Sequence, residues 1–355
     1  MNIRTLRILL KKEVLLLRRN PFIPRVIVVM PLLVMLILPL VANMEVKNVG
    51  CLLYMDASEY LDAKGAPQTY AEALRLVERD EADAILVIPP GYSKELAAGR
   101  APRLEVRANG VNATKGMLGA RYASQAAVQT IAHWQTEQGA APPAEAVSVV
   151  NCFNPTLDFR NYMIPALMVV LIIIICGFLP TLNLVSEKES GTIEAMNVTP
   201  VGKFTFVLSK LIPYWAAGLL VVTIGMTTGW LVYGLVPAGS VGAVYLAAIL
   251  FSLVMSGLGV SIANKSGTIL QSIFVTFAFI MVFQLMGGLF TPVSSMPGWA
   301  QKLTYAIPPR YFIEIMRAVY LKGATVADLW LQYALLAAFA ALFCAVAALT
   351  YRKQA

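Results

Sequence analysis

Six long apolar segments divide the chain, and the polar stretches between them are of very unequal length. The apolar segments are 22–42, 162–182, 204–233, 241–263, 268–290 and 329–351. A helix needs about 20 apolar residues to cross about 30 Å of hydrocarbon, because each backbone polar group must be satisfied within the segment. The pattern therefore predicts a polytopic α-helical membrane protein with six transmembrane helices.

A long polar stretch separates the first apolar segment from the second. Short apolar runs alternate there with helical patterns and with breaks such as Pro89-Pro90-Gly91, which is typical of an α/β domain. Strands are expected at 46–54, 84–88, 104–107 and 147–152, and helices at 70–80 and 114–138. We therefore predict an α/β domain over 43–160, inserted between transmembrane helices 1 (22–42) and 2, and a five-helix transmembrane domain over 161–355.

Basic residues crowd the first positions of the chain: Arg4, Arg7, Lys11, Lys12, Arg18 and Arg19. An excess of Lys and Arg beside a span marks the cytoplasmic side, so the N-terminus is expected there. Counting spans then places 43–160 outside the cytoplasm, and it places the C-terminus, with Arg352 and Lys353, inside. Basic residues within 302–322 are an exception to this charge bias, because the count places them outside.

The basic segment 1–20 also has helical periodicity, since apolar residues recur at steps of three and four from Ile3 to Leu17. This pattern predicts an amphipathic helix in the cytoplasmic membrane interface, with its basic side chains on anionic lipid headgroups. A plain basic flank that only sets the topology is the alternative. Membrane lipids are therefore the expected partners of this segment.

Composition agrees with a membrane protein. Hydrophobic residues make up 58% of the chain and charged residues only 14%, where a soluble domain has about 25% charged residues. A single soluble core is excluded. The net charge of +8 is concentrated beside the first span, so we expect no nucleic-acid partner.

The sequence contains no recognisable catalytic or metal-binding motif. The single histidine, His133, lies beside Trp134 without Cys, Asp or Glu at metal-ligand spacing, and no hydrolase or zinc motif is present. We expect no catalytic residue and no metal site. Cys51 and Cys152 lie in the first and last predicted strands, so a disulfide between them is a prediction for an oxidising compartment.

The middles of the predicted spans contain no charged residue. Ion-coupled carriers place ionisable groups at that depth, so a proton or sodium relay is not expected. Arg25 and Lys210 lie near cytoplasmic span ends, where their side chains are expected to snorkel toward water. Energy for uphill transport would therefore enter at a cytoplasmic surface.

The best candidate for that surface is the loop 183–203. Its acidic residues precede a short apolar helical stretch that ends at Thr199-Pro200, which predicts a brief helix parallel to the membrane. An ordinary charged loop is the alternative. The chain has no GxxxxGK[ST] phosphate-binding loop, so we do not expect it to bind ATP through that motif.

The chain resembles the permease subunits of bacterial type-2 ATP-binding cassette (ABC) exporters with a large extracytoplasmic domain. The order of spans and external domain is similar, and so is the loop pattern, formed by Glu187, Lys188, Glu189, Gly191, Thr192, Glu194, Thr199 and Pro200. Further likeness lies at 88–93, 288–292, 296–297 and 308–323.

This resemblance implies that 183–203 contains a coupling helix that docks on a separate ABC ATPase subunit. ATP and magnesium would bind in that partner, so this chain would need no cofactor and would not itself be an enzyme. Two ATPase copies and a second permease, identical or related, would complete the transporter, with a periplasmic adaptor protein as a further partner. The complex would lie in the bacterial inner (plasma) membrane and export a hydrophobic or amphiphilic substrate, drug-like or lipid-linked.

The resemblance also implies external re-entrant or short helices over 291–327. Residues of this segment that match the family are Pro292, Pro297, Pro308, Pro309, Arg310 and Tyr311.

Two other function classes remain open at this point. One is a membrane-anchored sensor or scaffold whose external domain binds a ligand, which we expect to require a cytoplasmic signalling domain. The other is a membrane-embedded enzyme acting on lipids, which would need nucleophiles, metal ligands or paired acids near the bilayer.

Overall fold

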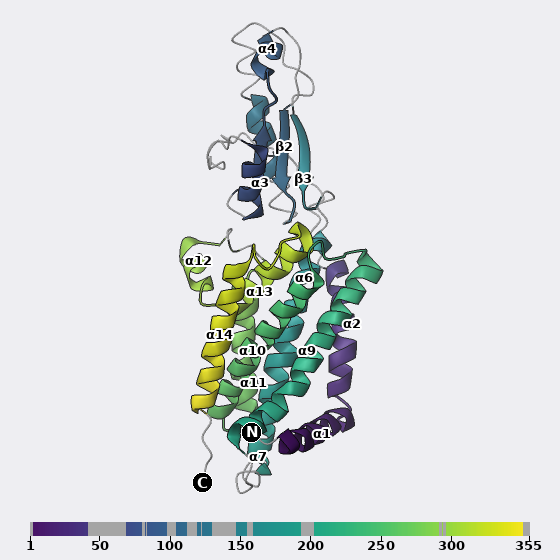
Figure 1. Ribbon diagram of the computed structural model, residues 1–355, viewed down its shortest axis with the longest axis vertical. Coiled ribbons are helices and arrows are strands. Elements are labelled where there is room, and N and C mark those ends of the chain that lie inside the picture. Colours follow the sequence, from purple (N-terminus) through teal and green to yellow (C-terminus); the bar gives the residue numbers. More distant parts are fainter. Residues whose placement is uncertain are drawn as a thin grey trace. The chain divides into compact units, whose positions relative to one another are not determined.

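The computed structural model describes residues 3–41, 69–79, 82, 84–97, 104–111, 119–121, 123–129, 147–154, 159–192, 202–290, 293 and 296–350. The chain forms two compact units, Met1–Ala42 with Met163–Ala355, and Asn43–Tyr162. The first is a bundle of helices and the second contains a small sheet (Figure 1). Each unit is described below by itself.

The helical unit contains helices long and apolar enough to cross a membrane at Arg160–Glu189, Phe204–Tyr233, Val241–Lys265, Ile269–Met286 and Trp330–Thr350. A bent pair, Ile3–Arg19 with Ile23–Pro39, provides a sixth if it is one span. The expectation of a polytopic helical membrane protein is confirmed, with about 5–6 candidate transmembrane helices in the described residues.

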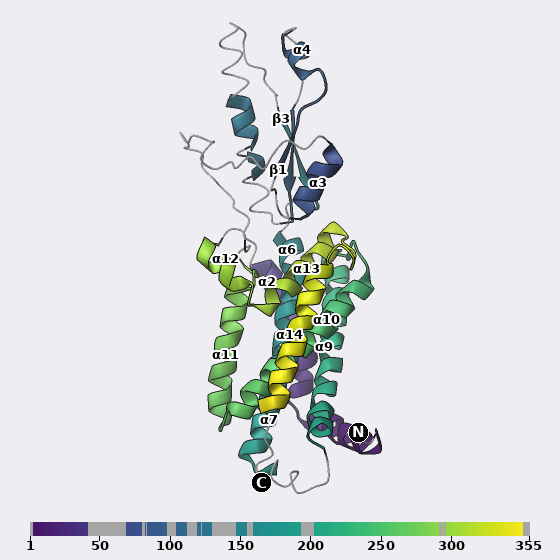
Figure 2. The same ribbon diagram turned by 60° about the vertical axis from the view of Figure 1, so that its left-hand side comes forward.

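Helix α1 (Ile3–Arg19) turns by 64° into α2 (Ile23–Val41). Asn20 caps α2 at this bend, because its side-chain oxygen accepts hydrogen bonds from the N–H groups of Phe22 (2.9 Å), just before the helix, and Ile23 (3.3 Å), its first residue. Figure 2 shows α1 lying across the direction of the long helices. The position of α1 in the membrane interface stays a prediction.

A tyrosine on α9 (Lys203–Tyr233) compensates for a proline in α2. Pro39 has no N–H, so it cannot satisfy the Met35 carbonyl one turn earlier. The Tyr233 hydroxyl donates to the carbonyls of Met35 and Leu36, both at 3.0 Å. The proline is therefore tolerated in an apolar environment, where a lone carbonyl would be costly.

The second apolar segment forms one continuous helix in three parts, α6 (Phe159–Ile172), the π-helix η2 (Ile173–Phe178) and α7 (Leu179–Glu189). The wide turn precedes Pro180, whose missing N–H interrupts the regular α-helical bonding. The helix extends to Glu189, well beyond the predicted end of the span at Leu182. The start of the predicted loop 183–203 is therefore helical.

Helix α10 (Val241–Lys265) lies in the interior of the bundle, as does the continuous helix Arg160–Glu189, whose most apolar stretch is 83% buried. In the most apolar stretch of α10, 78% of residues are buried, compared with 22% in both α11 (Ile269–Met286) and α14 (Trp330–Thr350). Helices α11 and α14 therefore expose broad apolar faces, as membrane-spanning helices do.

Short helices follow α11: α12 (Gly298–Thr304), α13 (Pro308–Arg317) and the π-helix η4 (Ala318–Lys322). Pro297 is the N-cap of α12, and Pro308 and Pro309 form the first turn of α13. These are short helices within the range 291–327, and Pro292 lies outside the described residues. Whether the segment faces the outside stays a prediction.

Polar contacts tie the short helices together. The Arg310 guanidinium donates to Glu314 (2.9 Å) and to the Thr304 hydroxyl (2.5 Å), and it lies over the Tyr305 ring. The Tyr311 hydroxyl donates to the Tyr305 carbonyl at 2.7 Å. Arg310 and Tyr311 thus hold α13 against the end of α12.

Arg317 closes the end of α11 by donating to the carbonyls of Gly288 (2.8 Å) and Leu289 (2.9 Å). We expect Arg317→Met to destabilise the chain by about 1.5 kcal/mol, because charge-assisted bonds to those carbonyls are lost. Thermal unfolding of the purified protein in detergent would measure this. Arg317→Lys should retain part of the stability, and an unchanged midpoint for Arg317→Met would contradict the assignment.

The second unit contains a sheet of β1 (Ala84–Val87), β2 (Leu104–Asn109) and β3 (Val147–Cys152), in the order β1-β2-β3. Strand β2 is antiparallel to β1 and parallel to β3. Helix α3 (Tyr70–Glu78) precedes β1, and α4 (Tyr92–Ala97) follows it. Of the predicted long helix 114–138, residues 119–121 and 123–129 are described and helical.

Glu105 and Arg107 lie on β2, and hydrogen bonds from Arg107 to Glu105 and to the Tyr70 hydroxyl raise the pKa of Arg107. Cys152 is half-buried at the end of β3, and burial raises the pKa of its thiol. Its predicted disulfide partner Cys51 and the predicted strand 46–54 lie outside the described residues, so that pairing stays a prediction.

Candidate functional site

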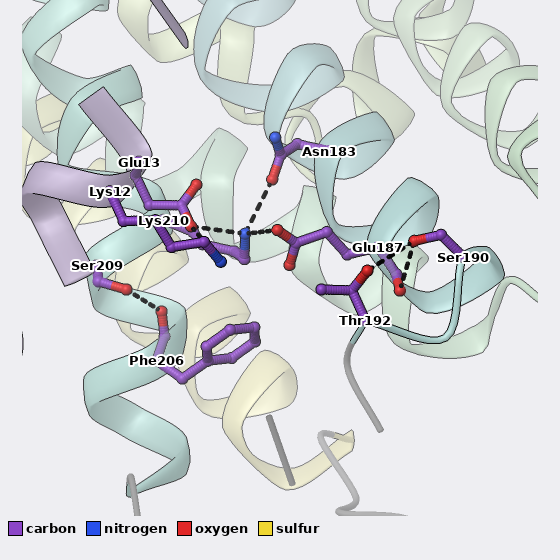
Figure 3. Close-up of polar contacts among 9 residues, drawn as sticks. All are labelled: Lys12, Glu13, Asn183, Glu187, Ser190, Thr192, Phe206, Ser209 and Lys210. Atoms are coloured by element: carbon purple, nitrogen blue, oxygen red, sulfur yellow. Dashed lines mark hydrogen bonds and ion pairs between the residues drawn. The ribbon is translucent and has the colours of Figure 1, made fainter. Parts of the chain in front are cut away.

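A buried ion cluster joins three helices at one end of the bundle, which we call the α7 end because the last turn of α7 lies there. The Lys210 ammonium of α9 lies 2.7 Å from Glu187 of α7 and 3.0 Å from Glu13 of α1. It also donates to the Asn183 side-chain oxygen at 3.2 Å. Figure 3 shows these groups converging on the lysine nitrogen.

The cluster lies in apolar surroundings. Lys210 is 1% exposed, and the Phe206 ring centroid lies 5.3 Å from its ammonium nitrogen. An apolar core packs at the same end of the bundle, formed by Leu184, Val185, Phe206, Leu211, Val260, Ala263 and Ala347. The expectation that Lys210 snorkels toward water was therefore wrong, because its charge is satisfied by two carboxylates inside the protein.

Two carboxylates share the fully buried ammonium group of Lys210. Glu13 and Glu187 side chains are 4% and 15% exposed, and the ammonium group of Lys12, which is partly exposed, lies 3.9 Å from Glu13. One oxygen of Glu187, Oε2, is buried without a hydrogen-bond partner in the described part of the chain, and so is the Tyr214 hydroxyl one turn beyond Lys210. The cluster therefore depends on Lys210 to compensate its carboxylates.

The next two residues of α7 contact the ends of other helices. Lys188 donates to the carbonyls of Ser266 (2.8 Å) and Asn264 (3.3 Å) at the C-terminus of α10. Glu189 accepts a hydrogen bond from the Ile269 N–H (2.9 Å) at the N-terminus of α11. Each side chain has the opposite sign to the partial charge of the helix end that it contacts, which stabilises each contact by about 0.3–1 kcal/mol.

Helix α7 ends in a left-handed turn. Gly191 has φ +72°, a conformation that favours glycine, and its N–H donates to the Lys188 carbonyl at 3.2 Å. The Ser190 hydroxyl bonds with the Glu187 carbonyl (3.3 Å) and with the Thr192 hydroxyl (3.0 Å). The Ser-Gly-Thr sequence thus stops the helix and redirects the chain (Figure 3).

The structure brings Glu187, Lys188, Glu189, Gly191 and Thr192 together at the α7 end. The remaining loop residues that the sequence singled out, Glu194, Thr199 and Pro200, lie outside the described residues, as does the predicted brief helix. No group of His, Cys, Asp or Glu that could hold a metal ion occurs among the residues that the structure describes.

Sequence reasoning missed Glu13 and Asn183. A signal for Glu13 was present, because it is the acidic residue on the apolar stripe of α1, spaced with Leu6, Leu10 and Leu17. A carboxylate on the stripe that faces the bundle needs a buried cation. Lys210, the one Lys of α9 beyond its first residue, was the available partner.

Comparison with known proteins places these features in a family. Residues 26–349 match the ABC-2 family transporter proteins. The chain is 28% identical over 340 residues to the "Probable multidrug ABC transporter permease YbhR" of Escherichia coli strain K12, covering 91% of each chain.

Two further relatives come from the same organism. The chain is 25% identical to the "Probable multidrug ABC transporter permease YbhS", covering 90% of this chain and 89% of the relative. It is 26% identical to the "Inner membrane transport permease YhhJ", covering 75% and 72%. The chain therefore belongs to the ABC-2 transporter family and is a multi-pass inner-membrane permease subunit, a family membership that implies an ATPase partner.

Proposed function

We propose that this permease exports a hydrophobic or amphiphilic substrate, drug-like or lipid-linked, from the cytoplasm or the inner leaflet. The observation that carries the proposal is the α7 end, where the chain leaves the bundle directly after Glu187-Lys188-Glu189, a triplet bonded to α9, α10 and α11. The names of two relatives, which call them probable multidrug permeases, support the substrate class. The apolar faces of α11 and α14 are compatible with a substrate that partitions into the membrane.

The energy source in this proposal is a separate ABC ATPase, present in two copies, which binds ATP and magnesium. A second permease, identical or related, completes the transporter, and a periplasmic adaptor contacts the external domain. Both termini and the α7 end face the cytoplasm, and 43–160 lies outside it. The basic residues of α1 support this orientation and a contact with anionic lipids.

Coupling in this proposal runs from the ATPase through the loop after Glu189. When two nucleotide-bound ATPase subunits close, the loop moves with them, and the movement reaches the helices that α7 contacts. A buried ion cluster suits this role because its geometry is specific: Lys210 holds α9 in register with α1 and α7. The permease supplies the path, and its partner supplies the hydrolysis.

Replacing 193–200 with a Gly/Ser linker of equal length tests this proposal while it leaves the bonded triplet intact. We expect the tagged variant to retain its fold but to bind the ATPase roughly 30-fold more weakly, because the docking surface is lost. Co-purification from native membranes, ATP hydrolysis and cellular efflux of ethidium would measure this.

Val236→Ser, in the exposed connection between α9 and α10, is the matched surface control and should leave all three readouts unchanged. Full ATPase binding and efflux in the linker variant would remove the coupling role of the loop. Recovery of the wild-type chain without any ATPase, under conditions that preserve known complexes, would favour a sensor or scaffold instead.

A further inference from the structure

Three consecutive residues at the end of α7 contact three different parts of the bundle. Successive helical residues project about 100° apart, so neighbours in sequence reach different sides of a helix. Glu187 reaches Lys210 on α9, Lys188 reaches the last carbonyls of α10, and Glu189 reaches the first turn of α11. The triplet Glu187-Lys188-Glu189 is therefore a branching point between the loop and separate helices.

Two side chains of this triplet, Glu187 and Lys188, are largely engaged within the chain, whereas Glu189 is exposed and uses one carboxylate oxygen for its contact with α11. The Lys188 ammonium donates to two carbonyls, at 2.8 and 3.3 Å. The Glu187 side chain is 15% exposed, and its carboxylate is paired with Lys210. Their charges are thus engaged before any partner arrives. This argues against Glu187 and Lys188 as a docking surface, although their charged sequence resembles one.

Helix α11 is the helix that such a connection could move most easily. Only 22% of its most apolar stretch is buried. A small apolar cavity lies between η2, α10 and α11, and the hydroxyls of Ser272 and Thr276 on the buried side of α11 have no hydrogen-bond partner in the described residues. A shift of α11 would therefore break few packed contacts and no side-chain hydrogen bond at these hydroxyls.

We propose that Glu187, Lys188 and Glu189 are positioning residues that transmit loop movement into the bundle, and that Glu189 makes the N-terminus of α11 follow the loop. The proposal rests on the ATPase coupling proposed above. Movement of α7 displaces the Glu189 carboxylate, and the Ile269 N–H follows it because that bond satisfies a free donor of the helix end. Lys188 acts in the same way on the C-terminus of α10.

Hydrogen exchange on the complete permease–ATPase complex, without nucleotide and with ATP plus vanadate, tests this without a transport substrate. In the wild type we expect nucleotide to change exchange in 266–274 about fivefold or more. Glu189→Ala should abolish that nucleotide-dependent change, and Glu189→Gln, which keeps an acceptor oxygen, should restore part of it. We expect a nucleotide-dependent change at 258–266 in the wild type as well, and Lys188→Met should abolish it.

Lys265→Met is the matched control, because it removes an exposed positive charge from the same end of α10 and should leave every response unchanged. ATPase binding and hydrolysis by the triplet variants should stay within about twofold of wild type, since the docking surface is intact. Loss of ATPase from Glu189→Ala would overturn the inference and make Glu189 a docking residue, leaving the proposed function in place. A preserved nucleotide response in Glu189→Ala would also overturn it.

Discussion

Lys210→Met is expected to lower the free energy of unfolding by about 3–5 kcal/mol, because it leaves the Glu13 and Glu187 carboxylates buried without their cation. Methionine matches the length of the lysine stem, so lost packing contributes little. Thermal unfolding of the purified chain at a constant detergent concentration would show the loss as a lower midpoint. Lys265→Met removes an exposed lysine of the same bundle end and should leave the midpoint unchanged.

A combined variant separates charge from shape. Lys210→Met with Glu13→Gln and Glu187→Gln should recover most of the stability, since replacing a whole buried cluster by neutral groups is often tolerated. Full stability of Lys210→Met alone would mean that water reaches the carboxylates. If the combined variant is stable but no longer couples ATP hydrolysis to efflux, the role of the cluster is to hold α1, α7 and α9 in register.

Gly257→Leu is expected to destabilise the contact between α10 and α14 by about 3 kcal/mol through overpacking. A Cβ atom at Gly257 would lie 2.8 Å from the Phe343 carbonyl carbon and 2.9 Å from the Cys344 nitrogen. These are backbone atoms, so α14 itself must move. Small residues let membrane helices approach this closely, and a branched side chain prevents it.

The yield of folded protein and its thermal midpoint in detergent would measure this effect. Gly257→Ala should show a smaller loss in the same direction. Gly242→Leu is the control on the same helix, because Gly242 is exposed and its nearest neighbour for a Cβ atom is Ser240 Oγ at 3.4 Å. Equal stability of the Gly257 and Gly242 leucine variants would contradict the close approach of α10 and α14.

These results bear on how the α7 end works. Two kinds of contact meet there: a buried ion cluster that fixes register, and exposed or partly exposed hydrogen bonds to the ends of α10 and α11. The buried contacts are costly to break, whereas the helix-end contacts are individually weak. The difference makes α1, α7 and α9 one rigid group and leaves α11 more easily displaced.

The sequence by itself determined the membrane-spanning architecture and most element positions. Spans such as α10 and α14 and strands such as β1 and β3 fall close to the predicted ranges, because runs of apolar residues and their periods are local properties of the chain. Span ends were less predictable. Helix α7 continues to Glu189 because its polar last turn finds partners on other helices, which no local pattern reveals.

Only the tertiary structure decided what the charged residues at the α7 end do. Glu13 and Lys210 are 197 positions apart, and Glu189 and Ile269 are 80 apart, so their pairing depends on how the helices pack. The sequence marked Glu187-Lys188-Glu189 as exceptional but could not tell a docking surface from an internal connection. For Glu187 burial distinguishes them, because a charge removed from water must find its partner within the fold, and for Lys188 and Glu189 the hydrogen bonds to helix ends do so.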